Sequence, residues 1–264
     1  MSSYEVWLAV AVETATAAAQ FLRAQWRQTH DVRGKGYRDV VTSTDLAVEA
    51  LILDHLRQAF PLHSILSEEA GRDAIGSEVV WLIDPLDGTV NFAHNNPNFA
   101  VSIAAVESGV PVVGVIADPL RDLLFTAHLG GGAMLNGAPL QTTSVMALDD
   151  AVLGFDTPRD AEGRQFMWAE MAQLLERVHT VRATGSAVLN MAYVAAGWLD
   201  LYTGFSIEPW DQAAAALLVQ EAGGAVGTVS GEPWMPYVRD PVMAATPTLL
   251  AGFAARAVLS EPAR

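Results

Sequence analysis

Hydrophobic positions change their spacing along the chain, and these changes predict a fold that mixes helices with strands. Residues 3–28 and 42–60 carry apolar side chains at helical spacing, with few helix-breaking residues among them. Continuous apolar runs at 79–83 and 99–118 are typical of buried strands. A Ser-Gly pair at 108–109 divides the second run, so we expect two antiparallel strands joined by a tight turn.

The remaining segments extend this pattern to the end of the chain. The glycine-flanked stretch 33–41 predicts a loop, and 63–71 predicts a short strand that runs into two glutamates. Further strands are expected at 122–137, 152–155, 179–183, 199–204 and 241–246, and further helices at 161–176, 186–197, 211–224 and 247–259. We therefore expect an α+β protein in two halves, 1–148 and 149–264, with no flexible linker between them.

Composition narrows the classes of function. The chain has 264 residues, 51% of them hydrophobic, and a formal net charge of −15. An acidic protein repels nucleic acid and anionic lipid at long range, and no apolar run reaches membrane-spanning length, so we expect neither partner. Glu5 and Glu13 interrupt the apolar N-terminus, which favours a helix over a signal peptide. The absence of cysteine fits a cytoplasmic protein.

Four carboxylates stand where the chain leaves a strand or enters a helix, namely Glu68, Asp84, Asp87 and Asp211. Taken alone, Asp211 is typical of a helix N-cap, Asp84 of a turn and Glu68 of a solvated loop. Taken together they indicate a cation site, because Asp84 follows a strongly apolar strand and a desolvated carboxylate must be neutralised. No lysine or arginine occurs within 73–120, and hard oxygen ligands without cysteine suit Mg²⁺.

The "DPLDGT" segment contains features that suit such a site. Pro85 fixes the turn and Gly88 permits a tight backbone, so the Leu86 carbonyl can also face the ion. The Gly88 and Thr89 N–H groups can hold a phosphate oxygen. A covalent aspartyl-phosphate is not supported, because the residue two positions before the second aspartate is Pro85, which carries no nucleophile. Attack by metal-activated water is the better interpretation.

Five segments, in the same order along the chain, resemble the inositol monophosphatase family of lithium-sensitive, Mg²⁺-dependent phosphatases. They are "DVVTSTD" (39–45), "SEE" (67–69), "DPLDGTVNFAH" (84–94), "GSA" (185–187) and "PWDQAAAALLVQEAGG" (209–224). One such motif is moderately specific, whereas the ordered set is very specific and covers most of the chain. The resemblance implies a layered α-β-α-β-α sandwich and a homodimer.

The resemblance also implies roles for individual residues. The implied metal ligands, for two Mg²⁺ ions or for three with a weaker one near Glu68, are Glu68, Asp84, the Leu86 carbonyl, Asp87 and Asp211. Asp45 and Thr89 would orient and deprotonate the attacking water, and Glu68 joins them in the implied catalytic set. The implied substrate contacts are Asp87, Gly88, Thr89, Gly185, Ser186, Ala187 and Asp211.

One position departs from the family pattern and leaves the substrate open. Members that act on inositol phosphates commonly carry an acidic residue seven positions before the aspartate of the Trp-Asp pair, where Gly204 stands here, and Glu208 is out of register. We expect hydrolysis of a small-molecule phosphomonoester, a polyol or sugar phosphate similar to inositol 1-phosphate. The same chemistry on fructose 1,6-bisphosphate, histidinol phosphate, a nucleotide 3′-phosphate or NADP stays open, as does a non-catalytic interaction role.

Overall fold

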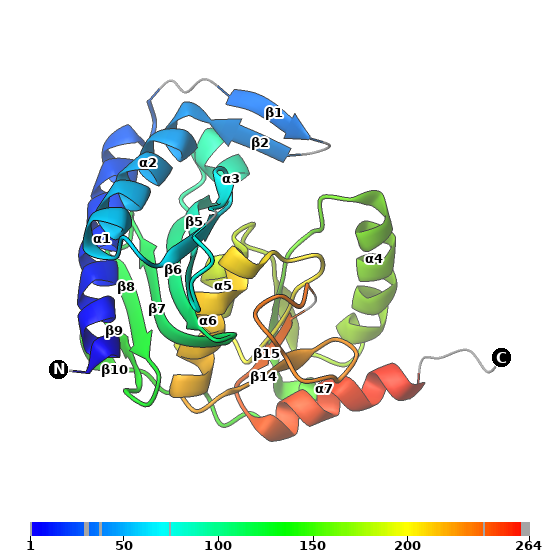
Figure 1. Ribbon diagram of the computed structural model, residues 1–264. Helices are drawn as coiled ribbons and strands as arrows, with labels where there is room; N and C mark the ends of the chain where they lie inside the picture. The colour runs from blue at the N-terminus through cyan, green and yellow to red at the C-terminus, as the bar shows by residue number, and fades with distance from the viewer. Residues whose placement is uncertain (1, 29–31, 37–38, 74, 240, 260–264) are drawn as a thin grey trace.

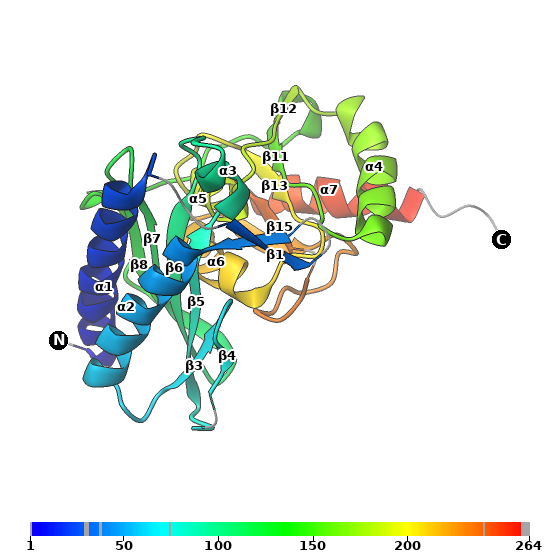
Figure 2. The ribbon, with the colours of Figure 1, turned by 90° about the horizontal axis from the view of Figure 1, so that it is seen from above.

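Helices and sheets alternate through the molecule in the order helix, sheet, helix, sheet, helix (Figures 1 and 2). The computed structural model describes residues 2–28, 32–36, 39–73, 75–239 and 241–259. The outer helices are α1 (Ser3–Gln25) and α2 (Ser43–Ala59) on one side and α4 (Ala161–Leu175) and α7 (Pro247–Leu259) on the other, with α5 (Ala187–Ala195) and α6 (Pro209–Glu221) between the sheets. The predicted layered sandwich is confirmed.

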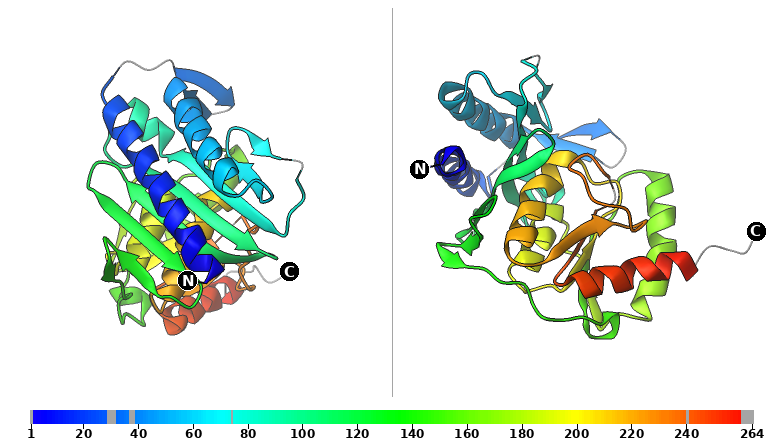
Figure 3. Two further views of the ribbon diagram at one scale, coloured as in Figure 1. Left: turned by 60° about the vertical axis from the view of Figure 1, so that its left-hand side comes forward. Right: turned by 60° about the horizontal axis from the view of Figure 1, so that its bottom comes forward.

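The larger sheet has eight strands, and Figure 3 shows α1 and α2 lying across one of its faces. Its strand order is β10-β9-β8-β7-β6-β5-β3-β4. The strands are β3 (Ser64–Ser67), β4 (Gly71–Arg72), β5 (Val79–Asp87), β6 (Ala100–Glu107), β7 (Val110–Asp118), β8 (Leu123–His128), β9 (Ala133–Leu135) and β10 (Ala138–Pro139). From β5 to β10 neighbours are antiparallel, as the meander predicted, whereas β3 and β5 run parallel.

The smaller sheet has five strands in the order β12-β11-β13-β15-β14. They are β11 (Val152–Phe155), β12 (Thr180–Arg182), β13 (Leu201–Thr203), β14 (Ala225–Thr228) and β15 (Pro241–Ala244), and a short 3₁₀ helix (Leu148–Asp150) precedes them. β11 runs parallel to β12 and to β13, so all three end at the same edge. The predicted boundary between 1–148 and 149–264 falls in the 3₁₀ helix and stays a prediction.

β5 is apolar along its whole length because both of its faces are buried. Trp81 and Ile83 point toward α1 and α2, whereas Val80 and Leu82 point toward α5 and α6. α6 is likewise buried on nearly every side, which fits its alanine-rich sequence and its central layer. Asp84 thus emerges from a strand enclosed by two hydrophobic cores. No helix in the described ranges combines the length and apolar character needed to cross a bilayer.

The sequence predictions were wrong or incomplete for several short segments. The stretch 33–41 is not a loop: β1 (Val32–Gly36) and β2 (Asp39–Thr42) form an antiparallel pair. Several short elements were not expected, among them β14 and the five-residue helix α3 (Thr89–Ala93). Glycine-rich or short segments carry weak local signals, and strand pairing with distant residues decides their structure.

Candidate active site

The two aspartates of the "DPLDGT" segment face the same side because β5 carries a bulge between them. Asp84 pairs with Ser102 of β6 and Asp87 pairs with Ala100, so the bulged strand has one extra residue. Residues three apart in a regular strand point to opposite faces, and the bulge removes that alternation. Asp84 is 2% exposed, and its Oδ1 accepts a hydrogen bond from the Leu86 N–H at 2.9 Å.

The third aspartate comes from the first turn of α6. This helix begins at Pro209, not at Asp211 as predicted, and Glu208 is its N-cap. Asp211 occupies the third helical position, where its Oδ2 accepts a hydrogen bond from the Glu208 N–H at 3.1 Å. Ser102 Oγ donates to the Trp210 carbonyl at 3.0 Å. This bond ties the start of α6 to β6 and so fixes Asp211 opposite the end of β5.

These three carboxylates form a cluster with the chemistry of a cation site. One oxygen each of Asp84, Asp87 and Asp211 lies within 4.8 Å of the other two. Burial, followed by the charge of Glu68, raises the pKa of Asp84 well above its usual range, and burial and Asp211 do the same for Asp87. Burial and Glu68 raise the pKa of Asp211 to about 7. A bound cation relieves this repulsion, and hard oxygen donors fit a divalent ion.

Glu68 lies beside this cluster at the end of β3. Its N–H donates to the Ile83 carbonyl of the parallel strand β5 at 3.2 Å, which places it next to Asp84. Its Oε1 lies 3.6 Å from a guanidinium nitrogen of Arg159. Because its charge raises the pKa of both Asp84 and Asp211, Glu68 belongs to the same electrostatic group, although it is outside the set within 4.8 Å.

Thr89 and Asp45 form a hydrogen-bonded pair. Thr89 Oγ1 lies 3.0 Å from Asp45 Oδ1 and 3.0 Å from the Leu86 carbonyl oxygen, so its proton can be donated to either. Asp45 is held by Thr42, the N-cap of α2, whose N–H and hydroxyl donate to Asp45 Oδ2 at 3.0 and 2.5 Å. Burial raises the pKa of Asp45, although these hydrogen bonds act to lower it. The carboxylate is therefore fixed with Oδ1 toward Thr89.

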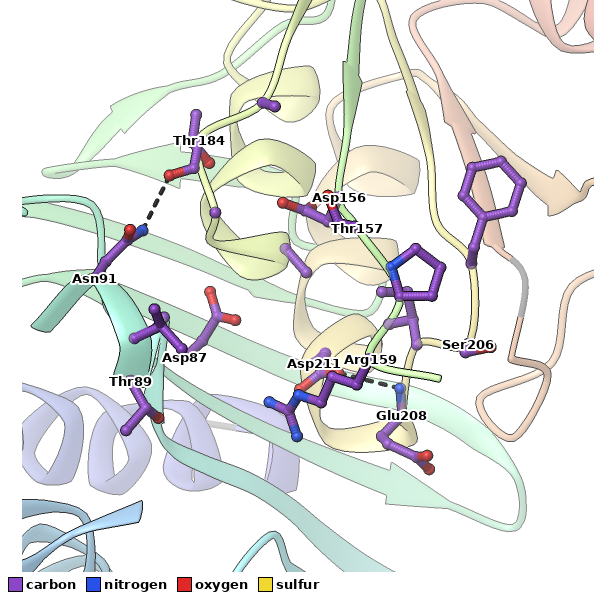
Figure 4. Close-up of a pocket in the computed structure, with 18 of the residues that line it drawn as sticks. Asp87, Thr89, Asn91, Asp156, Thr157, Arg159, Thr184, Ser206, Glu208 and Asp211 are labelled. Atoms are coloured by element: carbon purple, nitrogen blue, oxygen red, sulfur yellow. Dashed lines mark hydrogen bonds between the residues drawn. The ribbon is translucent and has the colours of Figure 1, made fainter. Parts of the chain in front are cut away.

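Two glycines occupy places where no larger residue fits. Gly88 has a φ of 85°, and a Cβ there would lie 2.7 Å from the Asn98 carbonyl oxygen. Gly185 has a φ of 78°, and its Cβ would lie 2.9 Å from Asn91 Nδ2. That amide donates to the carbonyls of Asn98 at 2.7 Å and Thr184 at 3.0 Å. Figure 4 shows the second of these bonds. It thereby joins the turn after β5 to the turn before α5.

Ser186 is the N-cap of α5 and also holds Asp87. Its Oγ accepts a hydrogen bond from the Leu189 N–H at 3.1 Å and donates to Asp87 Oδ2. The same Asp87 oxygen accepts the Val188 N–H at 3.1 Å. The start of a helix favours negative charge, so α5 anchors this carboxylate. Ala187, the first residue of the helix, lines the adjoining cleft.

A cleft of about 620 Å³ opens over these groups (Figure 4). Its lining includes most of the residues predicted from the sequence, namely Glu68, Asp87, Gly88, Thr89, Gly185, Ala187 and Asp211. The other predicted residues lie next to members of this lining, and they are Asp45, Asp84, Leu86 and Ser186. The structure thus brings the whole predicted set together, while the roles of the individual residues stay predictions.

Glu49 supports the site and was not predicted from the sequence. This α2 side chain is 5% exposed, and its Oε1 accepts hydrogen bonds from the Ser67 hydroxyl and from the N–H groups of Glu69 at 3.1 Å and Ala70 at 3.0 Å. It therefore fixes the step from strand to loop that carries Glu68. A carboxylate inside an amphipathic helix gives no signal of this role in the sequence.

Asp156 is a second carboxylate that was missed. It follows β11 and lines the cleft. Burial raises its pKa to about 6, although hydrogen bonds, first among them those from Asn190, act in the opposite direction. A signal was present, because Asp156 follows the apolar run 152–155 much as Asp84 follows 79–83.

The metal-free protein should lose stability as the pH rises. The pKa of Asp211 is about 7 in the folded chain and about 4 in an unfolded one, so only the folded state holds this proton between those values. Stability therefore falls as the pH rises from about 4 through 7, and Asp84 and Asp87 shift in the same sense. We expect MgCl₂ to raise the melting temperature by several degrees more at about pH 7.5 than at about pH 5, measured against NaCl of equal ionic strength. An equal rise at both pH values would contradict the cation site.

Comparisons with known proteins agree with the fold and the site. The model of the inositol monophosphatase family matches residues 3–261. The chain is 38% identical to inositol monophosphatase 1 of Solanum lycopersicum over 267 residues, which covers 98% of this chain and 97% of that protein. It is 40% identical to the Nus factor SuhB of Escherichia coli K12 over 228 residues, or 85% of each chain.

Solved structures give the same result. The chain superposes on the extragenic suppressor protein suhB from Bartonella henselae with a TM-score of 0.91 and 32% identity, covering 97% of this chain and 100% of that one. With the inositol monophosphatase from Anabaena the TM-score is 0.87 and the identity 34%, over 99% and 98% of the two chains. The resemblance inferred from the ordered motifs is confirmed: the chain belongs to the inositol monophosphatase family and is a phosphoric monoester hydrolase.

Proposed function

We propose that the protein is a Mg²⁺-dependent phosphomonoesterase that hydrolyses a small polyol or sugar phosphate. The observation that carries this proposal is the cluster of Asp84, Asp87 and Asp211, three mutually repelling carboxylates within 4.8 Å at one cleft. Glu68 and the Leu86 carbonyl complete the proposed ligand set, for two or three ions. Mg²⁺ held there supplies positive charge for the phosphate dianion and lowers the pKa of water.

Thr89 and Asp45 are the proposed acceptors of the proton from the attacking water. Thr89 Oγ1 takes this proton as it passes its own to Asp45 Oδ1, 3.0 Å away. The water oxygen bonds to phosphorus, and the ester P–O bond breaks with its electron pair on the alcohol oxygen, which takes a proton from solvent water. The raised pKa of Asp45 makes this carboxylate a better base than an exposed one.

A second candidate is a substrate with another anionic group, such as a sugar bisphosphate or a nucleotide. In the described ranges three arginines line the cleft, Arg159, Arg164 and Arg239, in a chain with 15 lysines and arginines against 30 acidic residues. The buried Nε of Arg164 has no hydrogen-bond partner among the residues that the structure describes. Arg239 pairs with Glu208 at 2.8 Å. Guanidinium groups bind phosphate in a two-pronged manner, which favours this candidate.

A panel of phosphate esters separates the two candidates. Purified protein with Mg²⁺ would be assayed on inositol 1-phosphate, glycerol 2-phosphate, fructose 1,6-bisphosphate, a nucleotide 3′-phosphate and NADP, ranked by kcat/KM. The leading proposal predicts that a polyol or sugar monophosphate ranks first. A bisphosphate or nucleotide in first place would instead select the second candidate.

Lithium should inhibit at concentrations where sodium does not. Li⁺ is close in size to Mg²⁺ and accepts similar ligands, but its single charge stabilises the leaving oxygen poorly. Because Asp211 is a proposed ligand, Asp211→Asn should weaken both Mg²⁺ activation and Li⁺ inhibition, whereas the exposed Asp149→Asn should change neither. Steady-state rates across LiCl and MgCl₂ titrations measure both effects. If Asp211→Asn stays fully active with unchanged lithium sensitivity, Asp211 only supports the start of α6.

Assembly and location complete the proposal. We expect a homodimer, as the sequence resemblance implies, and light scattering after size-exclusion chromatography measures the mass of the particle. A chain without cysteine suits the reducing cytoplasm, where we expect the protein to act. Its net charge of −15 disfavours direct binding to nucleic acid.

A further inference from the structure

Asp156 is a carboxylate in the cleft that the proposed chemistry does not use. It shares the cleft lining with Asp87 and Asp211, but it is outside the group of three carboxylates within 4.8 Å. Asn190 of α5, which is 0% exposed, donates from Nδ2 to both Asp156 oxygens at 3.2 and 3.0 Å. This amide fixes the carboxylate so that it points into the cleft on the side of Asp87 (Figure 4).

The register of the smaller sheet places Asp156 next to Gly204. β11 and β13 are parallel and Phe155 pairs with Thr203. Positions 156 and 204, the next residue along each strand, therefore lie side by side at the same edge of the sheet. A Cβ at position 204 would lie 2.5 Å from Ile207 Cγ1, so a side chain there would displace that residue. Asp156 is therefore the carboxylate that this edge of the sheet presents to the cleft.

We propose that Asp156 binds hydroxyl groups of the alcohol part of the substrate, in place of an acidic side chain at position 204. The inference rests on the proposed function, in which the phosphate lies at the Asp84, Asp87 and Asp211 cluster. An ionised carboxylate only accepts hydrogen bonds, and hydroxyl groups are the donors that a sugar or polyol offers. The alcohol then extends from the cluster along the cleft to Asp156.

The lining of the cleft offers hydrogen-bonding groups for an alcohol that carries several hydroxyl groups. The cleft contains both acidic side chains and arginines, so the assignment rests on hydrogen bonding and not on net charge. Neutral polar side chains, Thr157 and Ser206, also line the cleft and add further hydrogen-bonding groups for a polyhydroxylated molecule. Asp156 is thus assigned to the specificity for the alcohol and not to the chemical step.

The test compares two esters in the Asp156→Asn protein with Mg²⁺. Inositol 1-phosphate has hydroxyl groups on its alcohol, whereas p-nitrophenyl phosphate has none. The ratio of kcat/KM for the first ester to that for the second should fall about tenfold to a hundredfold, mainly through the KM for inositol 1-phosphate. Glu162→Gln, which removes an exposed carboxylate in the first turn of α4, should leave this ratio unchanged.

Three results would overturn the inference. One is an unchanged ratio in a variant whose melting temperature matches that of the unsubstituted protein. Another is an equal loss on both esters with a shifted Mg²⁺ activation midpoint, because Asp156 would then belong to the metal site. The third is a selective loss on an amino-alcohol phosphate. Failure of the proposed function is different, because then the unsubstituted protein releases no phosphate from either ester with Mg²⁺.

A second measurement applies if Asp156→Asn does not fold. The unsubstituted protein would be assayed on inositol 1-phosphate and on analogues that each lack one hydroxyl. We expect at least one analogue to lose about tenfold or more in kcat/KM, because a hydroxyl that donates to a carboxylate is missing. Equal turnover of every analogue would contradict the inference.

Discussion

Replacing Asp84 by asparagine should reduce kcat by a factor on the order of 10³ or more, the upper end of what one charge-stabilising group contributes. Asp84 is 2% exposed, and its pKa is raised by this burial and by the negative charges of three neighbouring carboxylates, namely Glu68, Asp211 and Asp87. Its carboxylate would be one of the groups that hold Mg²⁺, so its loss would remove negative charge from the proposed cation site. Phosphate release with saturating Mg²⁺ measures the effect, and the exposed Asp54→Asn should retain full activity.

The same substitution should stabilise the metal-free protein. Burial and three neighbouring carboxylates raise the pKa of Asp84, so the ionised group destabilises the fold when no cation is bound. Asparagine removes that charge and keeps the shape. We therefore expect Asp84→Asn to melt at a higher temperature than the unsubstituted protein in EDTA, while the stabilisation by MgCl₂ is lost. A variant that stays active, or one inactive only because it unfolds, would contradict the assignment of Asp84.

Thr89→Ala should lower kcat by about 10²–10⁴, the usual range for general acid–base catalysis, while KM changes little. Thr89 Oγ1 lies 3.0 Å from Asp45 Oδ1 and forms the proposed path for the proton of the attacking water. The hydroxyl acts on this water and not on the bound substrate, so the loss should appear in the chemical step. Steady-state kinetics on one ester measure kcat and KM separately.

Thr89→Ser is the matched control, because serine keeps the hydroxyl and removes only the methyl group. It should recover most of the lost rate. Asp45→Asn should be about as slow as Thr89→Ala, and the double variant should be little slower than either, since both residues serve one proton transfer. If Thr89→Ala raises only KM, then Thr89 is a binding residue and the proposed proton path is wrong.

The sequence predicts the structure correctly where the signal is local or where several motifs act together. The apolar run of β5 and its closing aspartates predicted a buried strand with a charged end, and the structure has both. The proximity of Asp87 and Asp211 could not be derived from the local sequence pattern, because it depends on how α6 packs against β6. Only the ordered motifs, through the family resemblance, linked these distant segments before the fold was known.

The features that were missed depend on pairing between distant segments. Asp156 reaches the cleft because β11 and β13 are parallel and in register at Phe155 and Thr203, and neither strand indicates its partner by itself. Glu49 could not be predicted for the same reason, because its hydrogen bonds join α2 to the end of β3 and the loop that follows. The glycines of 33–41 predict a loop, although the β-branched residues of Asp39–Thr42 favour a strand, and the structure has the β1–β2 pair there.

The most direct test of the proposed Mg²⁺-dependent hydrolysis is phosphate release by the protein after exhaustive dialysis against EDTA, followed by titration with MgCl₂. Inositol 1-phosphate and p-nitrophenyl phosphate would be used in parallel, with Asp84→Asn as the inactive control. We expect no release without metal, recovery that saturates with Mg²⁺, and no recovery in Asp84→Asn. Full activity in EDTA, or equal activity in Asp84→Asn, would contradict it.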